Sequence, residues 1–375
     1  MQTDATLVLS GICLGIAITG LTSNAVGREC KTSRLYLRLV YGVFAGVFSL
    51  PLITAFAPAL FLVYFPAILI MLLTLAPAVF YYVVAKSPEL DPIPFKWRDG
   101  FLPLAGCIVT IGFWLLPLED KRTMLIEGDL PTDIASNILA FTAFALILLW
   151  PISSLAYLIA TLRRLRSYRE TLLTIYSNID QRDLCWVNWL MGFLVALWAA
   201  GTIGFTGENF GKGPPFEPVL FYLLAAGVLI FLNIFASLTS PPTAHIKETA
   251  ESPDKYSRSA LSKDHMESLA ARIEKSMMQD ALYLDPNLSL QKLSRYVGAL
   301  PNHISQTLND QIGSTFFDYV AHWRIEASKL LLKSSDASVL TVALEVGFNS
   351  KSTFYKAFGR ETGLSPNQYR KAGNK

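Results

Sequence analysis

The stretch VLTVALEVGFNSKSTFYKAFGRETGLSPNQYR, residues 339–370, predicts two short helices separated by a sharp break. The first helix carries an apolar stripe at helical spacing, formed by Leu340, Ala343 and Val346 and widened by Val339 and Val342. Gly347 ends this helix, because glycine enters the left-handed C′ conformation without a Cβ clash. A tight glycine turn between two short helices is typical of a helix-turn-helix.

The second helix of this stretch has one apolar and one polar face. Asn349 or Ser350 can cap its start, and Phe354 and Phe358 lie one turn apart and are expected to face inward. Its outer face carries Lys351, Ser352, Tyr355 and Lys356. Such a helix could enter a DNA major groove, but the spacing alone fits a helical hairpin with a solvated face equally well.

A long ordered signature separates these two interpretations. The residues Gly347-Phe348-x-Ser350-x-Ser352-x-Phe354-x-x-x-Phe358, followed by Gly363-x-Ser365-Pro366-x-x-Tyr369-Arg370, closely resemble the signature of AraC/XylS-type transcription regulators. The resemblance covers about residues 265 to 371 and extends to none of the preceding chain. It implies a DNA-binding domain at this end of the protein.

The composition differs from that of a water-soluble regulator. Of 375 residues, 52% are hydrophobic and only 16% are charged, against about 25% charged in typical soluble domains. The mean hydropathy is +0.39. The four cysteines have no CxxC spacing and the histidines have no metal-ligand spacing, so we expect no zinc site, disulfide framework, metal or cofactor.

Residues 1–238 are predicted to form a polytopic transmembrane domain of seven helices. An uncharged run of about 20 residues can cross the hydrocarbon core, and the run Leu39–Ala85 is long enough for two spans with a turn near Phe56–Ala59. The other candidates are Ala5–Val26, Phe101–Leu118, Ile134–Leu162, Leu184–Phe205 and Val219–Leu238. The whole chain is therefore expected to be all-α.

The loops predict an orientation for these spans, because cytoplasmic loops carry the excess of Lys and Arg. With the N-terminus outside, the inner loops hold Arg28, Lys31, Arg34, Lys86, Lys96, Arg98, Arg163, Arg164, Arg166, Arg169 and Arg182. The outer loops hold only Lys121, Arg122 and Lys212. This arrangement places the C-terminal domain in the cytoplasm and the protein in a bacterial inner membrane.

A linker, residues 239–263, leads to a soluble helical domain, residues 264–375, which contains a second helix-turn-helix. Leu290, Leu293 and Val297 form an apolar stripe, Gly298 breaks the helix, and Pro301 begins the next one. That helix turns Ile304 and Leu308 inward and carries the polar face Asn302, Ser305, Gln306 and Asn309.

A helix from Ser314 to Lys333 joins the two motifs, as the resemblance to AraC/XylS proteins also implies. By that resemblance, Asn302–Asn309 and Lys351–Arg360 are recognition helices that enter adjacent major grooves about 34 Å apart. The resemblance assigns base reading to Asn302, Ser305, Gln306, Ser352, Tyr355 and Lys356. The predicted DNA-binding set adds Asn309, Lys351 and Arg360 from the same helices.

Charge is unequal between the two motifs. The first recognition helix has no Lys or Arg, where family members often have an arginine, whereas residues 349–375 hold six basic residues and one acid. Electrostatic affinity should therefore come mainly from the second motif. The amides of the first motif suit adenine.

These features favour a membrane-embedded one-component transcription regulator that binds double-stranded promoter DNA. The spans hold no charged residue beyond their rims, which disfavours ion-coupled transport and favours an apolar or lipid-like signal. A homodimer on DNA is expected, and RNA polymerase is a further candidate partner. A membrane receptor or carrier whose helical tail binds a protein partner is the alternative. No pattern of an enzyme is found.

Overall fold

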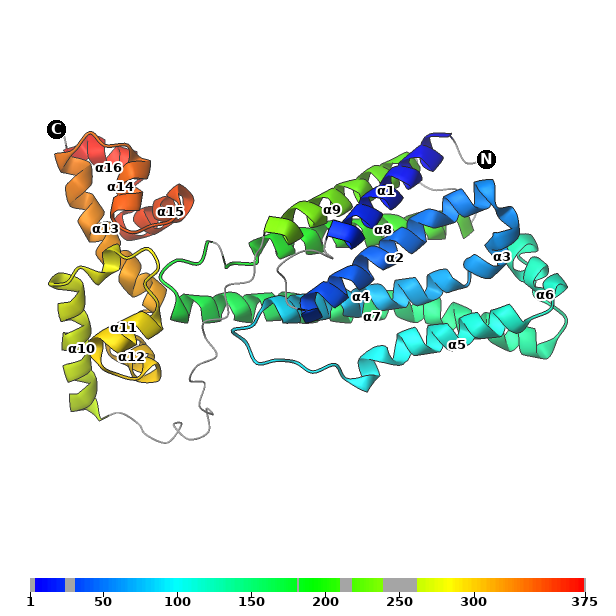
Figure 1. Ribbon diagram of the computed structural model, residues 1–375, viewed down its shortest axis with the longest axis horizontal. Coiled ribbons are helices and arrows are strands. Elements are labelled where there is room, and N and C mark those ends of the chain that lie inside the picture. Colours follow the sequence, from blue (N-terminus) through cyan, green and yellow to red (C-terminus); the bar gives the residue numbers. More distant parts are fainter. Residues whose placement is uncertain (1–3, 24–30, 181, 210–217, 239–261, 374–375) are drawn as a thin grey trace. The chain divides into compact units, whose positions relative to one another are not determined.

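The protein is helical throughout the part that the structure describes. The computed structural model describes residues 4–23, 31–180, 182–209, 218–238 and 262–373 (Figure 1). Every regular element in these ranges is a helix, which confirms the predicted fold class. The chain divides into two compact units. The first is Met1–Arg166 with Leu184–Pro241, and the second is Ser167–Asp183 with Pro242–Lys375.

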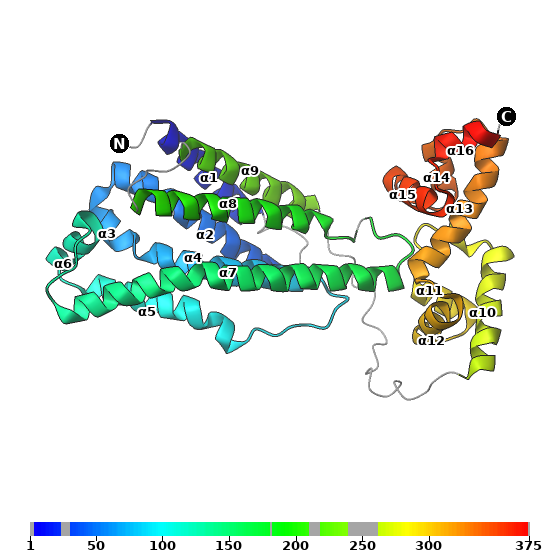
Figure 2. The same ribbon diagram turned by 180° about the vertical axis from the view of Figure 1, so that it is seen from behind.

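The first unit is a bundle in which long apolar helices are joined by short ones, and one of the long helices, α7, continues into the second unit. Its helices are α1 (Asp4–Ser23), α2 (Lys31–Phe56), α3 (Phe61–Tyr64), α4 (Ala67–Lys86), α5 (Phe101–Leu115), α6 (Leu118–Arg122), α7 (Ile134–Ile175), α8 (Cys185–Asn209) and α9 (Pro218–Leu238). Helix α2 packs against α1 and α4, α9 packs against α1 and α8, and α4 packs against α5 (Figures 1 and 2).

Six of the described helices are long and apolar enough to cross a membrane. They are α1, α2, α4, α5 together with the 3-10 turn Trp97–Gly100, α7 and α8. The described apolar part of α9, Val219–Phe235, is shorter. Helix α2 ends at Phe56 and a 3-10 turn follows at Pro58–Leu60, so the break between the second and third predicted spans lies where the sequence predicted it. The count of seven spans stays a prediction.

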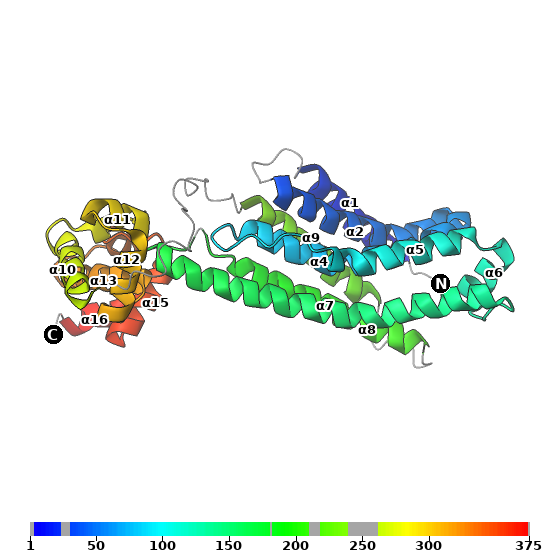
Figure 3. The same cartoon turned by 90° about the horizontal axis from the view of Figure 1, so that it is seen from below.

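Helix α7 continues beyond the end of the fifth predicted span. The predicted span ended at Leu162, before a cluster of arginines, but the helix continues for another three turns to Ile175 (Figure 3). The end of an apolar run marks the edge of a hydrophobic layer and not the end of a helix. Arginine, leucine and glutamate all favour helix, and the residues from Arg163 to Ile175 include no Gly or Pro to stop it.

The second unit contains the C-terminal helices and the end of α7. The helices are α10 (Lys263–Met278), α11 (Leu290–Val297), α12 (Pro301–Thr307), α13 (Phe316–Ser334), α14 (Val339–Glu345), α15 (Lys351–Thr362) and α16 (Pro366–Gly373). A π-helical turn, Leu308–Ile312, extends α12. The predicted linker, residues 239–263, lies outside the described residues except at its last two positions.

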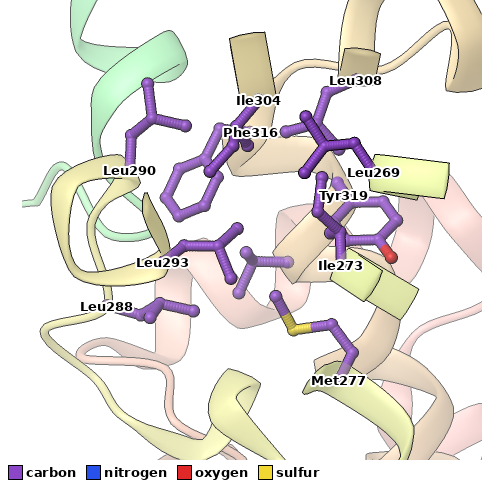
Figure 4. Packing of buried hydrophobic residues seen from close by; sticks show 11 residues of the cluster. Leu269, Ile273, Met277, Leu288, Leu290, Leu293, Ile304, Leu308, Phe316 and Tyr319 are labelled. Atoms are coloured by element: carbon purple, nitrogen blue, oxygen red, sulfur yellow. The ribbon is translucent and has the colours of Figure 1, made fainter. Parts of the chain in front are cut away.

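Two apolar cores lie on either side of the linking helix α13. The first core joins α10, α11 and α12 to the start of α13, with Ile273, Leu293 and Ile304 fully buried (Figure 4). The second core joins the end of α13 to α14, α15 and α16, and both Phe354 and Phe358 are fully buried in it. Each helix-turn-helix therefore has a core of its own, and α13 contributes to both.

Candidate nucleic-acid interface

The first helix-turn-helix consists of α11, a glycine turn and α12. The hydroxyl of Ser289 caps α11 by accepting a hydrogen bond from the backbone N–H of Lys292 at 3.3 Å. Gly298 ends the helix with a φ of +64°, as the sequence predicted. Pro301 begins α12, and Leu300 before it makes no side-chain cap. Buried Ile304 and Leu308 then fix which face of α12 looks outward.

The second helix-turn-helix consists of α14, a tighter glycine turn and α15. Gly347 has a φ of +93°, and a Cβ there would lie 2.7 Å from the carbonyl oxygen of Tyr283. Ser350 is the N-cap of α15, since its hydroxyl accepts a hydrogen bond from the backbone N–H of Thr353 at 3.2 Å. Gly363 ends α15 in the left-handed conformation. Only glycine fits at position 347, because both φ and the nearby carbonyl exclude a side chain.

One expectation for α14 was wrong. The predicted stripe included Leu340, but its side chain is 46% exposed. The buried face is Val339, Val342, Ala343 and Val346, which have the spacing i, i+3, i+4 and i+7. The sequence contains two overlapping apolar stripes here, and packing on α13 selects the one that begins at Val339.

A buried arginine lies where the two motifs meet. Arg324 of α13 is fully buried, and it donates hydrogen bonds to the carbonyl oxygens of Tyr283 at 2.7 Å and Asp285 at 2.9 Å. Its guanidinium also lies over the ring of Phe348, 5.5 Å from the centroid. Burial lowers the pKa of this side chain to about 10, and the nearby Asp285 carboxylate opposes that effect. Arg324 remains charged at neutral pH.

The predicted polar face of α12 is outward and unpartnered. Asn302 and Asn309 are exposed, and Ser305 and Gln306 are half-buried. Within the described ranges, none of these four side chains has a hydrogen-bond partner in the protein. Side-chain amides that are exposed and unpaired on one face can donate to and accept from base edges.

The predicted polar face of α15 is also outward, and three of its side chains are exposed: Lys351, Ser352 and Lys356. The ammonium of Lys351 lies over the ring of Tyr355, 5.4 Å from its centroid. The hydroxyl of half-buried Tyr355 accepts a weak hydrogen bond from Asn367 at 3.3 Å. Lys356 has no ion-pair partner among the described residues, so its full charge is available to a phosphate or a base.

Arg360 differs from the two lysines of α15. Its guanidinium donates to the Asp318 carboxylate of α13 at 2.5 Å, and its side chain is 57% exposed. An arginine already paired with a carboxylate loses that bond if it turns to a phosphate. Of the predicted cations on α15, Arg360 therefore has the weakest claim to a DNA contact.

Two features of this unit were missed by sequence reasoning. Exposed His322, Glu326 and Glu361 lie close enough for one atom of each to approach a common ion, although they come from α13 and α15. The His322 Nδ1 lies 2.7 Å from the Glu361 carboxylate. The second feature is the segment 176–180, which follows α7 and packs among the C-terminal helices. Neither has a signal in the sequence, because each depends on residues far apart along the chain.

Comparison with known proteins supports the assignment of this domain. A family model described as "Helix-turn-helix domain" matches residues 293–372. The chain is 36% identical over 89 residues to an uncharacterized HTH-type transcriptional regulator of Staphylococcus aureus, and 44% identical over 70 residues to the HTH-type transcriptional regulator MtrA of Neisseria gonorrhoeae. These matches cover 24% and 19% of this chain, and 12% and 23% of the two relatives.

The solved structures that are similar match a comparable fraction of the chain. One is the C-terminal domain of the two-component response regulator YesN from Fusobacterium nucleatum, at 28% identity and a TM-score of 0.24. The match covers 28% of this chain and 98% of the YesN domain. By the family model and the sequence relatives, the C-terminal domain of the protein is an AraC-type helix-turn-helix DNA-binding domain of the kind found in transcription regulators.

Proposed function

We propose that this protein is a membrane-embedded one-component transcription regulator, in which apolar helices sense a signal and the C-terminal domain binds promoter DNA. The observation that carries the proposal is the pair of outward-facing polar faces on α12 and α15, held by one linking helix in a chain that also has long apolar helices. A regulator built in this way needs no separate kinase or receptor, because sensor and DNA reader share one polypeptide.

The two motifs would divide the work of DNA recognition. Lys351 and Lys356 neutralise phosphates and supply the affinity that depends on salt, since each neutralised phosphate releases counterions. Asn302 and Gln306 have no charge to offer, but an amide can make two hydrogen bonds to an adenine edge. A site for this protein would then hold two unlike halves about one helical turn apart.

The first unit has the surface expected of lipid contact. Helix α7 carries large apolar side chains on its exposed faces, including Ile138 at 62%, Phe141 at 62% and Ile152 at 66% exposure. In an apolar stretch of this helix, only 6% of the residues are buried. Exposed apolar surface on this scale favours a hydrocarbon environment over water. The predicted spans hold no charged residue beyond their rims, which favours an apolar or lipid-like signal.

The orientation is proposed from the arginines and lysines of the loops. An outside N-terminus and a cytoplasmic C-terminus agree with the distribution of basic residues, and a cytoplasmic tail is the only one that meets chromosomal DNA. A phosphatase that is active only outside the cytoplasm, fused after Lys375, should be inactive. The same enzyme fused after Asp129 should be active. Activity at Lys375 would contradict the proposal.

DNA binding is tested with the full chain in lipid nanodiscs. Genomic fragments captured by the purified chain should share two short elements about 10 base pairs apart, and the double variant Gln306→Ala with Lys356→Ala should lose them. Capture without any shared element, or equal capture by the double variant, would overturn the proposed site. If the chain binds no DNA even at low salt but captures a protein, the alternative of a receptor with a protein-binding tail would be favoured.

A further inference from the structure

The segment that joins α7 to α8 makes buried contacts with the DNA-binding helices. Residues Ser167–Asp183 belong to the same compact unit as the C-terminal domain, although they lie between two predicted spans in the sequence. Tyr176, Ser177, Asn178 and Ile179 are all buried. Tyr176 forms an isolated antiparallel bridge with Ser289, the N-cap of α11. A loop between two spans that is buried in this way is docked on the domain.

Ser177 and Asn178 bind at the meeting point of the two motifs. The backbone N–H and the hydroxyl of Ser177 both donate to the carbonyl oxygen of Leu288, at 3.2 and 2.7 Å. The amide of Asn178 donates to the carbonyl oxygen of Pro286 at 2.6 Å and to that of Gly347 at 3.0 Å. Asn178 thus connects the segment before the first motif to the turn of the second.

The buried Arg324 makes half of its hydrogen bonds to the same segment. Its guanidinium donates to the carbonyl oxygen and to the hydroxyl of Ser177, each at 3.1 Å. Its other two bonds go to the carbonyl oxygens of Tyr283 and Asp285. The charge of a buried arginine needs all of these acceptors. The docked segment therefore completes a polar network that fixes the linking helix against both motifs.

The last residue of the segment reaches the start of the second recognition helix. The carboxylate of exposed Asp180 accepts a hydrogen bond from the hydroxyl of Thr353, in the first turn of α15. A carboxylate at this end of a helix is stabilised by the backbone N–H groups and the helix dipole. The same features attract DNA phosphates, and the N-terminal part of a recognition helix is the part that approaches base edges.

We infer that residues 176–180 form an intramolecular docking segment whose Asp180 carboxylate competes with DNA for the start of α15. Docking holds the two motifs in one arrangement and places a negative charge where a phosphate would lie. Release of the segment frees Thr353 and the neighbouring polar face. Because α7 is one continuous helix from Ile134 to Ile175, a shift of its apolar part is transmitted to the segment. The inference rests on the proposed function and assigns the route of its regulation.

The first experiment measures the affinity of the full chain in nanodiscs for its captured DNA site. Asp180→Asn should tighten binding by about three- to tenfold, because one carboxylate is removed from the phosphate position. The matched control is Glu170→Gln, which removes the same charge from an exposed position of α7 in the same unit. Equal affinities for the parent chain and Asp180→Asn, or equal gains in both variants, would overturn the inference.

The second experiment locks the segment in place. Asp180→Cys with Thr353→Cys, in a chain whose four native cysteines are replaced by serine, should form a disulfide on mild oxidation because the two side chains are in contact. The oxidised protein should bind DNA at least about tenfold more weakly than the reduced one, and Asp180→Cys alone should show no such difference. DNA affinity unchanged by the lock would overturn the competition.

The lock also separates failure of the inference from failure of the proposed function. Disulfide formation requires no DNA, so a poor yield of cross-linked chain overturns docking whatever the protein binds. If the double-cysteine chain cross-links well but neither it nor the parent chain binds DNA at any salt concentration, the proposed function fails and the competition fails with it. If the parent chain and the reduced double-cysteine chain bind DNA, and oxidation of the double-cysteine chain leaves its affinity unchanged, the inference alone fails.

Discussion

The two helix-turn-helix motifs have the same plan and opposite chemistry. In the first, the turn at Gly298 is open, since a Cβ at this position would meet no atom within 4 Å, and α12 has no Lys or Arg. In the second, the turn at Gly347 is pressed against the carbonyl oxygens of Tyr283 and Leu284, and α15 carries Lys351, Lys356 and Arg360. The second motif is thus the charged one, and its turn is the one in close contact with carbonyl oxygens of another segment.

The two turn glycines give the largest expected difference. Gly347→Ala should destabilise the C-terminal domain by about 4 kcal/mol. The alanine would be strained in the left-handed conformation, and its Cβ would collide with the backbone carbonyl oxygens of Tyr283 and Leu284. Gly298→Ala should cost about 1 kcal/mol, because only the strain applies. The measurement is hydrogen exchange of the α13 amides in the full chain. Equal losses for the two variants would mean that the turns are equally open.

The linking helix gives the next largest effect. Arg324→Met should destabilise the same domain by about 3 kcal/mol, because the carbonyl oxygens of Tyr283, Asp285 and Ser177 lose their donor in a buried place. Arg360→Met, on the exposed face of α15, should cost less than about 1 kcal/mol. Thermal unfolding of each full-chain variant compares them. A small loss for Arg324→Met would show that water replaces the guanidinium.

The sequence predicted both motifs because their signals are local. Gly298 and Gly347 each end a helix, Ser350 caps the next, and the spacing of Phe354 and Phe358 sets its buried face. Each of these signals depends on residues within one or two turns of each other. Such patterns are sufficient to place the polar faces of α12 and α15 on the outside.

The docked segment was not predicted because its contacts are not local. Ser177 and Arg324 are 147 positions apart, and nothing in a short polar stretch after a run of arginines indicates what it will touch. The sequence predicts a span that ends at Leu162, and hydropathy alone does not indicate that the helix continues to Ile175. Both features concern the same part of the chain, the end of α7 and the residues after it.

The difference in charge is tested by the salt dependence of DNA binding. Lys356→Ala should weaken binding by about 1 to 3 kcal/mol and reduce the slope of log K against log salt by about 1, if Lys356 neutralises one phosphate. Gln306→Ala should weaken binding by a similar amount and leave the slope unchanged, since an amide releases no counterion. Affinities of the full chain across a salt series measure both. A lower slope for Gln306→Ala would contradict the division of work between the motifs.

The smallest expected effect concerns how each recognition helix begins. Ser350 caps α15 with its hydroxyl, whereas Leu300, which precedes α12 with extended backbone angles of φ −67° and ψ 142°, has no group to do so. Ser350→Ala should therefore cost about 1 kcal/mol, and Leu300→Ser should add about 0.5 kcal/mol by supplying the missing cap. Hydrogen exchange at the first amides of α12 and α15 measures each effect where it arises. If Leu300→Ser gives no protection, Pro301 alone is sufficient to start α12, because its fixed φ is already helical and it has no N–H to be capped.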